Sequence, residues 1–136
     1  MKFGVQLVSK EIFILPEKLV TIRLKFLFSF VFELNESNLN DHTEEGVSVI
    51  DFWAPWCGPC KMLTPIMEKV SEHYSDNSSV VIGKVNVDEE VGLAGTYGIT
   101  AVPTLVFLKD GEVVKTVTGV QPQPIITEAI DTLLGL

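Results

Sequence analysis

Runs of hydrophobic residues alternate along this chain with polar or glycine-containing turns, and the spacing within the runs changes from one to the next. Apolar residues at helical spacing predict helices, whereas continuous or alternating apolar residues predict strands. After a first strand that ends near residue 34, the pattern predicts helices over 35–46, 58–74, 88–97 and 122–134 and strands over 47–54, 80–87, 105–108 and 113–118. This order indicates an α/β fold with a central mixed β-sheet flanked by helices on both faces.

A charged residue interrupts each of two strands that otherwise look buried. The strand over 47–54 is apolar apart from Ser48 and Asp51, which is typical of a central strand covered on both faces. A carboxyl group there is costly unless it is paired or protonated, so burial should raise the pKa of Asp51. Lys84, in the strand over 80–87, is its natural partner if the two strands are parallel neighbours. The alternative is that Asp51 lies at a strand end and faces water.

The first 29 residues differ in composition from the rest of the chain. They hold five basic and two acidic residues, whereas the remainder holds five basic and sixteen acidic residues. We therefore divide the chain into a basic, apolar N-terminal extension, residues 1–29, and a domain, residues 30–136. Apolar residues at even positions from Ile22 to Leu34 make the extension β-prone, and a turn near Pro16 suggests an extra hairpin.

The extension lacks the features of a targeting segment. Its uninterrupted apolar run is too short to span a bilayer, and the first alanine of the chain is Ala54, so the small-residue cleavage site of a signal peptide is missing. Membrane attachment and export are therefore disfavoured. The formal net charge of −8 argues against nucleic acid as a partner. Two cysteines in a single pair fit a reducing compartment, so we expect a cytoplasmic location.

The only two cysteines, Cys57 and Cys60, lie where the strand over 47–54 gives way to the helix over 58–74. The first N–H groups of a helix have no partner within it, and they favour a thiolate, the reactive form of cysteine. Gly58 lets the chain turn tightly beside the sulfur, and Pro59 suits the first helical turn, where a missing N–H costs nothing. Two sulfurs held this closely can form a disulfide and reopen it.

Two other uses of these cysteines must be weighed. A structural disulfide would close so short a loop that it would constrain the unfolded chain little. A zinc site would use Cys57, Cys60 and His73, but its second histidine is missing from 77–79, where the chain reads Asn-Ser-Ser. Redox chemistry that needs neither a metal nor a bound cofactor is therefore favoured.

Several motifs together resemble the thioredoxin family over the domain from about residue 30 to the C-terminus. The residues that carry the resemblance are Asp51-Phe52-Trp53-Ala54-Pro55-Trp56-Cys57-Gly58-Pro59-Cys60-Lys61, then Pro65, Lys84-Val85-Asn86-Val87-Asp88, Val102-Pro103-Thr104, Lys109-Asp110-Gly111 and Gly119. A Cys-x-x-Cys pair alone is weak evidence, but here the flanking tryptophans and the downstream motifs agree. The extension departs from the family pattern.

The resemblance implies a thioredoxin fold and a role for each matching residue. Cys57 is expected to be the exposed nucleophile that attacks a substrate disulfide, and Cys60 the deeper thiol that resolves the mixed disulfide. Asp51, paired with Lys84, is expected to accept the Cys60 proton through a water. Pro103 is expected to follow a cis peptide bond. The apolar substrate-binding surface is expected to comprise Trp56, Gly58, Pro59, Val102 and Gly119.

The resemblance further implies a protein-disulfide reductase. Its partners would be disulfide-containing proteins and, as electron donor, a thioredoxin reductase that uses NADPH. Two other functions remain open. The chain could be a non-catalytic subunit that binds a partner near the cysteines or through the extension. Alternatively, the extension could tether an exported thiol oxidoreductase to a membrane.

Overall fold

The computed structural model describes residues 30–136. The hairpin and most of the alternating strand predicted before Phe30 lie outside the described residues. The strands are β1 (Phe32–Glu33), β2 (Val47–Trp53), β3 (Val80–Asn86), β4 (Thr104–Lys109) and β5 (Glu112–Thr118). The helices are α3 (Leu39–Thr43), α4 (Gly58–His73), α5 (Val91–Thr96) and α6 (Gln123–Leu134). This element order is the one predicted from the hydrophobic pattern.

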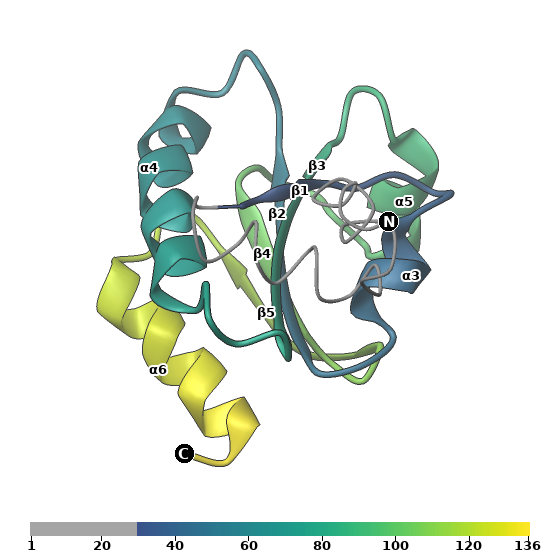
Figure 1. The fold of residues 1–136 in the computed structure, drawn as a ribbon. Helices are drawn as coiled ribbons and strands as arrows, with labels where there is room; N and C mark the ends of the chain where they lie inside the picture. The colour runs from purple at the N-terminus through teal and green to yellow at the C-terminus, as the bar shows by residue number, and fades with distance from the viewer. Residues whose placement is uncertain (1–29) are drawn as a thin grey trace, which may run out of the picture.

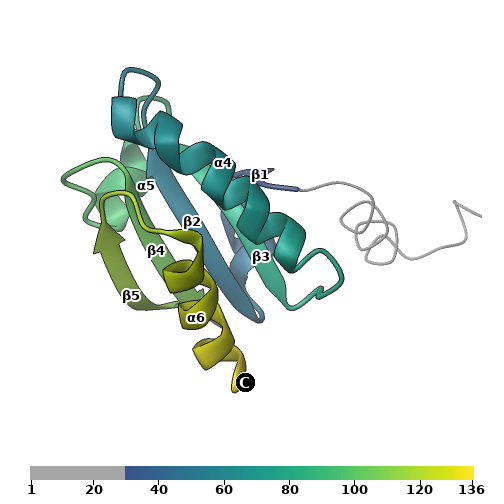
Figure 2. The same cartoon turned by 90° about the vertical axis from the view of Figure 1, so that its left-hand side faces the viewer.

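The strands form one sheet in the order β1-β3-β2-β4-β5. β1, β3 and β2 run parallel to one another, whereas β4 is antiparallel to β2 and β5 is antiparallel to β4. Helices α4 and α6 cover one face of the sheet, and α3 and α5 cover the other (Figure 1, Figure 2). The predicted mixed sheet with helices on both faces is confirmed, and β2 is its central strand.

Each face of the sheet carries its own hydrophobic core, and β2 contributes to both. Val47 and Val49 belong to the cluster shared with α4 and α6, whereas Ile50 and Phe52 belong to the cluster shared with α3 and α5. Burial on both faces explains why β2 is almost continuously apolar. Because side chains alternate along a strand, Asp51 lies on the same side as Val47 and Val49 and faces α4.

Hydrogen bonds hold α4 against its neighbours. Tyr74, the residue after α4, donates its hydroxyl to the carbonyl oxygen of Thr127 at 3.0 Å and to Oδ1 of Asp131 at 2.7 Å, both in α6. The hydroxyl of Ser71 accepts the N–H of Phe30 at 2.7 Å and donates to the carbonyl oxygen of the same residue at 2.8 Å. The start of the described chain is thereby fixed to the helix that carries the cysteines.

Helix α5 begins later than predicted. We expected a helix from residue 88, but Asn86 holds the chain in a turn. Its Oδ1 accepts the N–H of Asp88 at 2.9 Å, and its carbonyl oxygen accepts the N–H groups of Glu89 and Glu90. Asparagine commonly forms such turns with the backbone two residues ahead. The helix therefore starts at Val91, and Asp88 belongs to the turn instead.

Candidate active site

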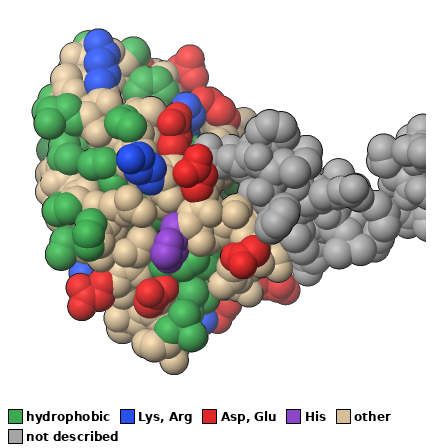
Figure 3. Space-filling model, turned by 60° about the vertical axis from the view of Figure 1, so that its left-hand side comes forward, with side chains coloured by type: hydrophobic (Ala, Val, Ile, Leu, Met, Phe, Trp, Pro, Cys, Tyr) green, Lys and Arg blue, Asp and Glu red, His purple; other side chains and the backbone are tan. Residues whose placement is uncertain are grey.

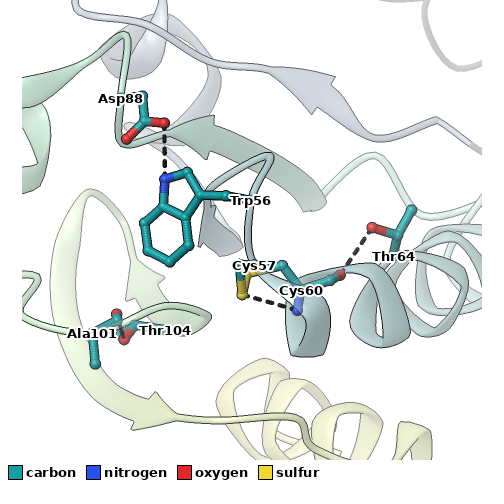
Figure 4. The surroundings of a disulfide bond; sticks show 7 residues. All are labelled: Trp56, Cys57, Cys60, Thr64, Asp88, Ala101 and Thr104. Atoms are coloured by element: carbon teal, nitrogen blue, oxygen red, sulfur yellow. Dashed lines mark hydrogen bonds between the residues drawn. A yellow bond between two sulfur atoms is a disulfide. The ribbon is translucent and has the colours of Figure 1, made fainter.

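The two cysteines lie at the junction of β2 and α4. Strand β2 ends at Trp53, and α4 begins at Gly58 with Cys57 as its N-cap in an extended conformation. Cys57 and Cys60 are joined by a disulfide, and Sγ of Cys57 accepts a hydrogen bond from the N–H of Cys60 at 3.1 Å (Figure 4). The Cys57 sulfur therefore lies at the positive end of a 16-residue helix, where a thiolate is stabilised once the disulfide is reduced.

Cys57 is less accessible than the resemblance led us to expect. It is 4 % exposed, and Cys60 is 1 % exposed. The expectation of an exposed Cys57 is thus corrected, because Trp53, Ala54 and Val102 pack around the pair. Cys57 still has the larger exposed fraction of the two cysteines.

Gly58 is not required by the turn. Its φ lies outside the left-handed region, and a Cβ at this position would meet no atom within 4 Å. The prediction that a tight turn needs glycine here is therefore wrong, because Gly58 is already the first residue of α4. Its missing side chain instead leaves the surface beside the disulfide open, and Pro59, the next residue of the helix, is also exposed.

Trp56 borders the disulfide and is 70 % exposed. Its indole Nε1 donates to Oδ2 of Asp88 at 3.1 Å, which joins the loop before α4 to the turn after β3 (Figure 4). From the sequence we expected Asp88 only to open a helix, so its place at the site was missed. The available signal is topological, since neighbouring parallel strands end at the same edge of a sheet and bring their following loops together.

The loop before β4 completes the edge of the site. The Val102–Pro103 peptide bond is cis, as the resemblance led us to expect. The N–H of Gly119 donates to the carbonyl oxygen of Pro103 at 2.8 Å, and the Thr104 hydroxyl donates to the carbonyl oxygen of Ala101 at 2.7 Å (Figure 4). Gly119 has a φ of 97°, which residues with a side chain rarely adopt. Gly119 is thus tied to the residue that follows Val102, and Val102 itself packs against the cysteines.

Asp51 is buried beneath the site. It is 4 % exposed, and among the described residues its Oδ1 has no hydrogen-bond partner. Burial, opposed in part by the charge of Lys84, raises the pKa of Asp51 from 3.8 to about 7. The prediction that burial raises this pKa is confirmed, and the alternative of a water-facing carboxyl is wrong. A carboxyl group with this pKa can take up or release a proton near neutral pH.

Lys84 lies beside Asp51 in the sheet, but it makes its ion pair elsewhere. The two residues are register partners on β3 and β2, as predicted for parallel neighbours. The Lys84 Nζ nevertheless lies 3.2 Å from Oε2 of Glu33, on β1, and 5.7 Å from the centre of the Trp53 ring. The expected Asp51–Lys84 ion pair is thus corrected. The physical reason is that the Glu33 side chain is 73 % exposed, so an ion pair there costs little desolvation, whereas Asp51 is buried.

The described residues offer no metal site. Among residues 30–136, no group of three or more His, Cys, Asp or Glu side chains is placed so that it could hold a metal ion. His73, considered above as a zinc ligand, lies in the last turn of α4 against the ring of Tyr74. It is therefore at the opposite end of the helix from Cys57.

A sulfur pair that can close and reopen at the edge of an α/β sheet is typical of proteins that exchange dithiols for disulfides. The family model described as thioredoxin matches residues 30–132, and this chain therefore belongs to the thioredoxin family. It is a thiol–disulfide oxidoreductase that reduces protein disulfides.

Individual relatives agree in sequence and in structure. The thioredoxin of Bacillus subtilis is 42 % identical over 101 residues, which cover 74 % of this chain and 95 % of the relative. Among solved structures, the thioredoxin of Malassezia sympodialis has a TM-score of 0.68 and 39 % identity, covering 76 % of this chain and 90 % of its own. A mutant thioredoxin from Halobacterium salinarum has the same TM-score of 0.68 with 34 % identity, covering 79 % and 94 %.

The two glycines of the site should respond differently to alanine. Gly119→Ala should destabilise the oxidised protein by about 1 kcal/mol or more, because a Cβ is strained at a φ of 97°. Gly58→Ala is the matched control and should leave stability unchanged or slightly higher, since its Cβ meets open space. Urea unfolding of both variants measures the difference, and equal stabilities would contradict the conformational account of Gly119.

Asp51 should make stability depend on pH. Its pKa in the folded protein, about 7, lies above its ordinary value of 3.8, so between these values the folded state holds a proton that the unfolded state has released. The free energy of unfolding should therefore fall as pH rises through this window, by up to about 1.4 kcal/mol per pH unit. Asp51→Asn should flatten this fall in urea unfolding of the oxidised protein, whereas Asp76→Asn, which changes an exposed turn, should retain it. A wild-type slope in Asp51→Asn would refute the assignment.

Proposed function

We propose that this protein reduces substrate disulfides in the cytoplasm with Cys57 as attacking thiol, Cys60 as resolving thiol and Asp51 as proton acceptor, and that a thioredoxin reductase returns the electrons. The observation that carries the proposal is the Cys57–Cys60 disulfide at the start of α4, with a buried carboxyl group on the strand beneath it. Family membership supports both the protein substrates and the reductase as partners.

The first step is attack by Cys57. Its thiolate forms a bond to one sulfur of the substrate disulfide, the substrate S–S bond breaks, and the second substrate sulfur leaves as a thiolate that takes up a proton. Two features favour the Cys57 thiolate, namely its position at the helix N-terminus and the Cys60 N–H that points at its sulfur at 3.1 Å. The product is a mixed disulfide between Cys57 and the substrate.

The second step is resolution by Cys60. Its thiol first loses a proton to the Asp51 carboxylate, through one bridging water, and the resulting thiolate attacks Sγ of Cys57. The Cys57–Cys60 bond forms, the mixed disulfide breaks, and the remaining substrate sulfur leaves and is protonated. Two electrons have then passed from the dithiol to the substrate. A pKa of about 7 and a position facing α4 suit Asp51 to this exchange.

The substrate surface is proposed to surround the Cys57 sulfur. Exposed Trp56, Gly58 and Pro59 border it on one side, and Val102 and Gly119 on the other. An extended substrate strand would lie across this open surface, with backbone groups of Val102 available to pair with it. On the face drawn in Figure 3, the basic side chains lie apart from one another, which favours a protein substrate over nucleic acid.

Residues 1–29 bear on the two alternative functions, a partner-binding subunit and a membrane-tethered oxidoreductase. Over residues 30–136, no helix combines the length and the apolar character needed to cross a membrane. A partner-binding subunit would keep its biological activity without the cysteines but lose it without residues 1–29. The catalytic function is favoured by family membership together with the intact Cys57–Cys60 pair.

Replacing the attacking thiol should abolish turnover. We expect Cys57→Ser to lose insulin disulfide reduction and to form no mixed disulfide, because no thiolate remains at the helix N-terminus. Cys60→Ser is the matched control, since it keeps the attacking thiol and should accumulate a mixed disulfide visible by mass spectrometry. Retained turnover in Cys57→Ser would end the proposed function.

Replacing the proton acceptor should slow resolution more than attack. We expect Asp51→Asn to slow resolution roughly 10-fold or more at pH 7, because a general base typically contributes 10²–10⁴-fold and water can replace part of it. Attack by Cys57 should change less. Single-turnover measurements that follow mixed-disulfide formation and decay separate the two steps, and equal slowing of both would count against Asp51 as acceptor.

A further inference from the structure

Three charged residues form a row across the sheet beneath the cysteines. Glu33 of β1 is the register partner of Lys84 of β3, and Lys84 is the register partner of Asp51 of β2. Register partners on parallel strands point to the same face of a sheet. Exposure falls along the row, from 73 % for the Glu33 side chain and 34 % for that of Lys84 to 4 % for Asp51. The row thus runs from a solvent-exposed acid, Glu33, to the buried carboxyl group of Asp51.

One cation lies between two acids in this row, and it is held by the outer one. Lys84 Nζ is 3.2 Å from Oε2 of Glu33, whereas Oδ1 of Asp51 has no partner among the described residues. The structure pairs the Lys84 ammonium with Glu33 rather than with its other register partner, Asp51. A change at Glu33 would therefore be expected to alter how close the Lys84 charge lies to Asp51.

No other described group competes for Asp51. Beyond it the row continues through Leu105 of β4 and Val117 of β5, which are apolar. The buried residues of α4, which packs against this face, are Cys60, Leu63, Met67, Val70 and Ser71. Among residues 30–136, the charged groups that face Asp51 on these packed elements are thus Lys84 and, behind it, Glu33.

We propose that Glu33 is a positioning residue for resolution: by holding the Lys84 ammonium at the outer end of the row, it withholds that charge from Asp51 and keeps Asp51 able to accept the Cys60 proton. This inference rests on the proposed role of Asp51 as proton acceptor. Glu33 would then influence the rate of resolution, the second step, although it is a surface residue that does not contact the sulfurs.

The direction of the effect follows from two contributions of the same sign. Neutralising Glu33 removes a negative charge near Asp51, and it also frees the Lys84 ammonium to approach the Asp51 carboxyl. Both changes favour the ionised form and lower the pKa of Asp51. A weaker base takes a proton from Cys60 less readily, so resolution should reach a lower plateau, with its midpoint at lower pH.

The test compares two charge-neutralising variants of the full chain. In Glu33→Gln, the midpoint of the Asp51 carboxyl titration, followed by carbon NMR in the oxidised protein, should fall by about half a pH unit or more. Glu45→Gln removes the same charge from an exposed residue before β2, at the far end of that strand from the cysteines, and should leave the titration in place. An unchanged titration in Glu33→Gln, or an equal shift in Glu45→Gln, overturns the inference.

A double variant separates positioning from simple charge. In a Lys84→Met background, Glu33→Gln should lower the midpoint of the Asp51 titration by less than it does in the wild-type background, because only the direct contribution of the Glu33 charge remains. A shift as large as in the wild-type background would overturn the positioning role.

Resolution kinetics distinguish this inference from the role of Asp51 on which it rests. If Asp51→Asn slows resolution but Glu33→Gln leaves both the titration and the resolution rate unchanged, the inference fails and the proposed function stands. If Asp51→Asn leaves resolution unchanged, the proton-acceptor role fails, and the inference about Glu33 fails with it.

Discussion

The structure depends on the burial of one strand on both of its faces. Strand β2 contributes alternate side chains to two separate cores, and this rigid strand delivers the chain to the start of α4. The same burial removes water from Asp51 and raises its pKa to about 7. Core packing and the raised pKa of Asp51 therefore both result from the burial of β2. A change that loosened the core would also lower the pKa of Asp51.

Above β2, the site is assembled from loops that hydrogen bonds hold in place. Trp56 is tied to Asp88, and Pro103 is tied to Gly119. These contacts connect the ends of β2, β3, β4 and β5 around the cysteines. A reaction that needs three sulfurs in line gains from such fixed positions, because the resolving thiol and the mixed disulfide are already oriented. The open surface at Gly58 shows that rigidity here does not require a closed pocket.

The sequence predicted those features that depend on local pattern. Helical and strand periodicity gave the order of elements, and an acid inside a continuous apolar run correctly indicated a buried carboxyl at Asp51. Features set by tertiary contacts were missed. The low exposure of Cys57 comes from side chains on separate segments, and the partner of Lys84 was wrong because β1 has only two residues. Nothing in so short a strand signals its register with β3.

The role proposed for Glu33 would let a weak surface ion pair influence the chemistry at the cysteines. An ion pair in which one side chain is 73 % exposed contributes little to folding, on the order of 0–1 kcal/mol. The proposed electrostatic effect of this ion pair on the Asp51 carboxyl exceeds its contribution to folding, because charges near that buried carboxyl are poorly screened. In this proposal the contact acts by setting the position of the Lys84 ammonium relative to Asp51. A buried acid that must change its protonation state in every cycle is better served by a cation kept nearby than by one bound to it, since a tight ion pair would hold the acid permanently ionised.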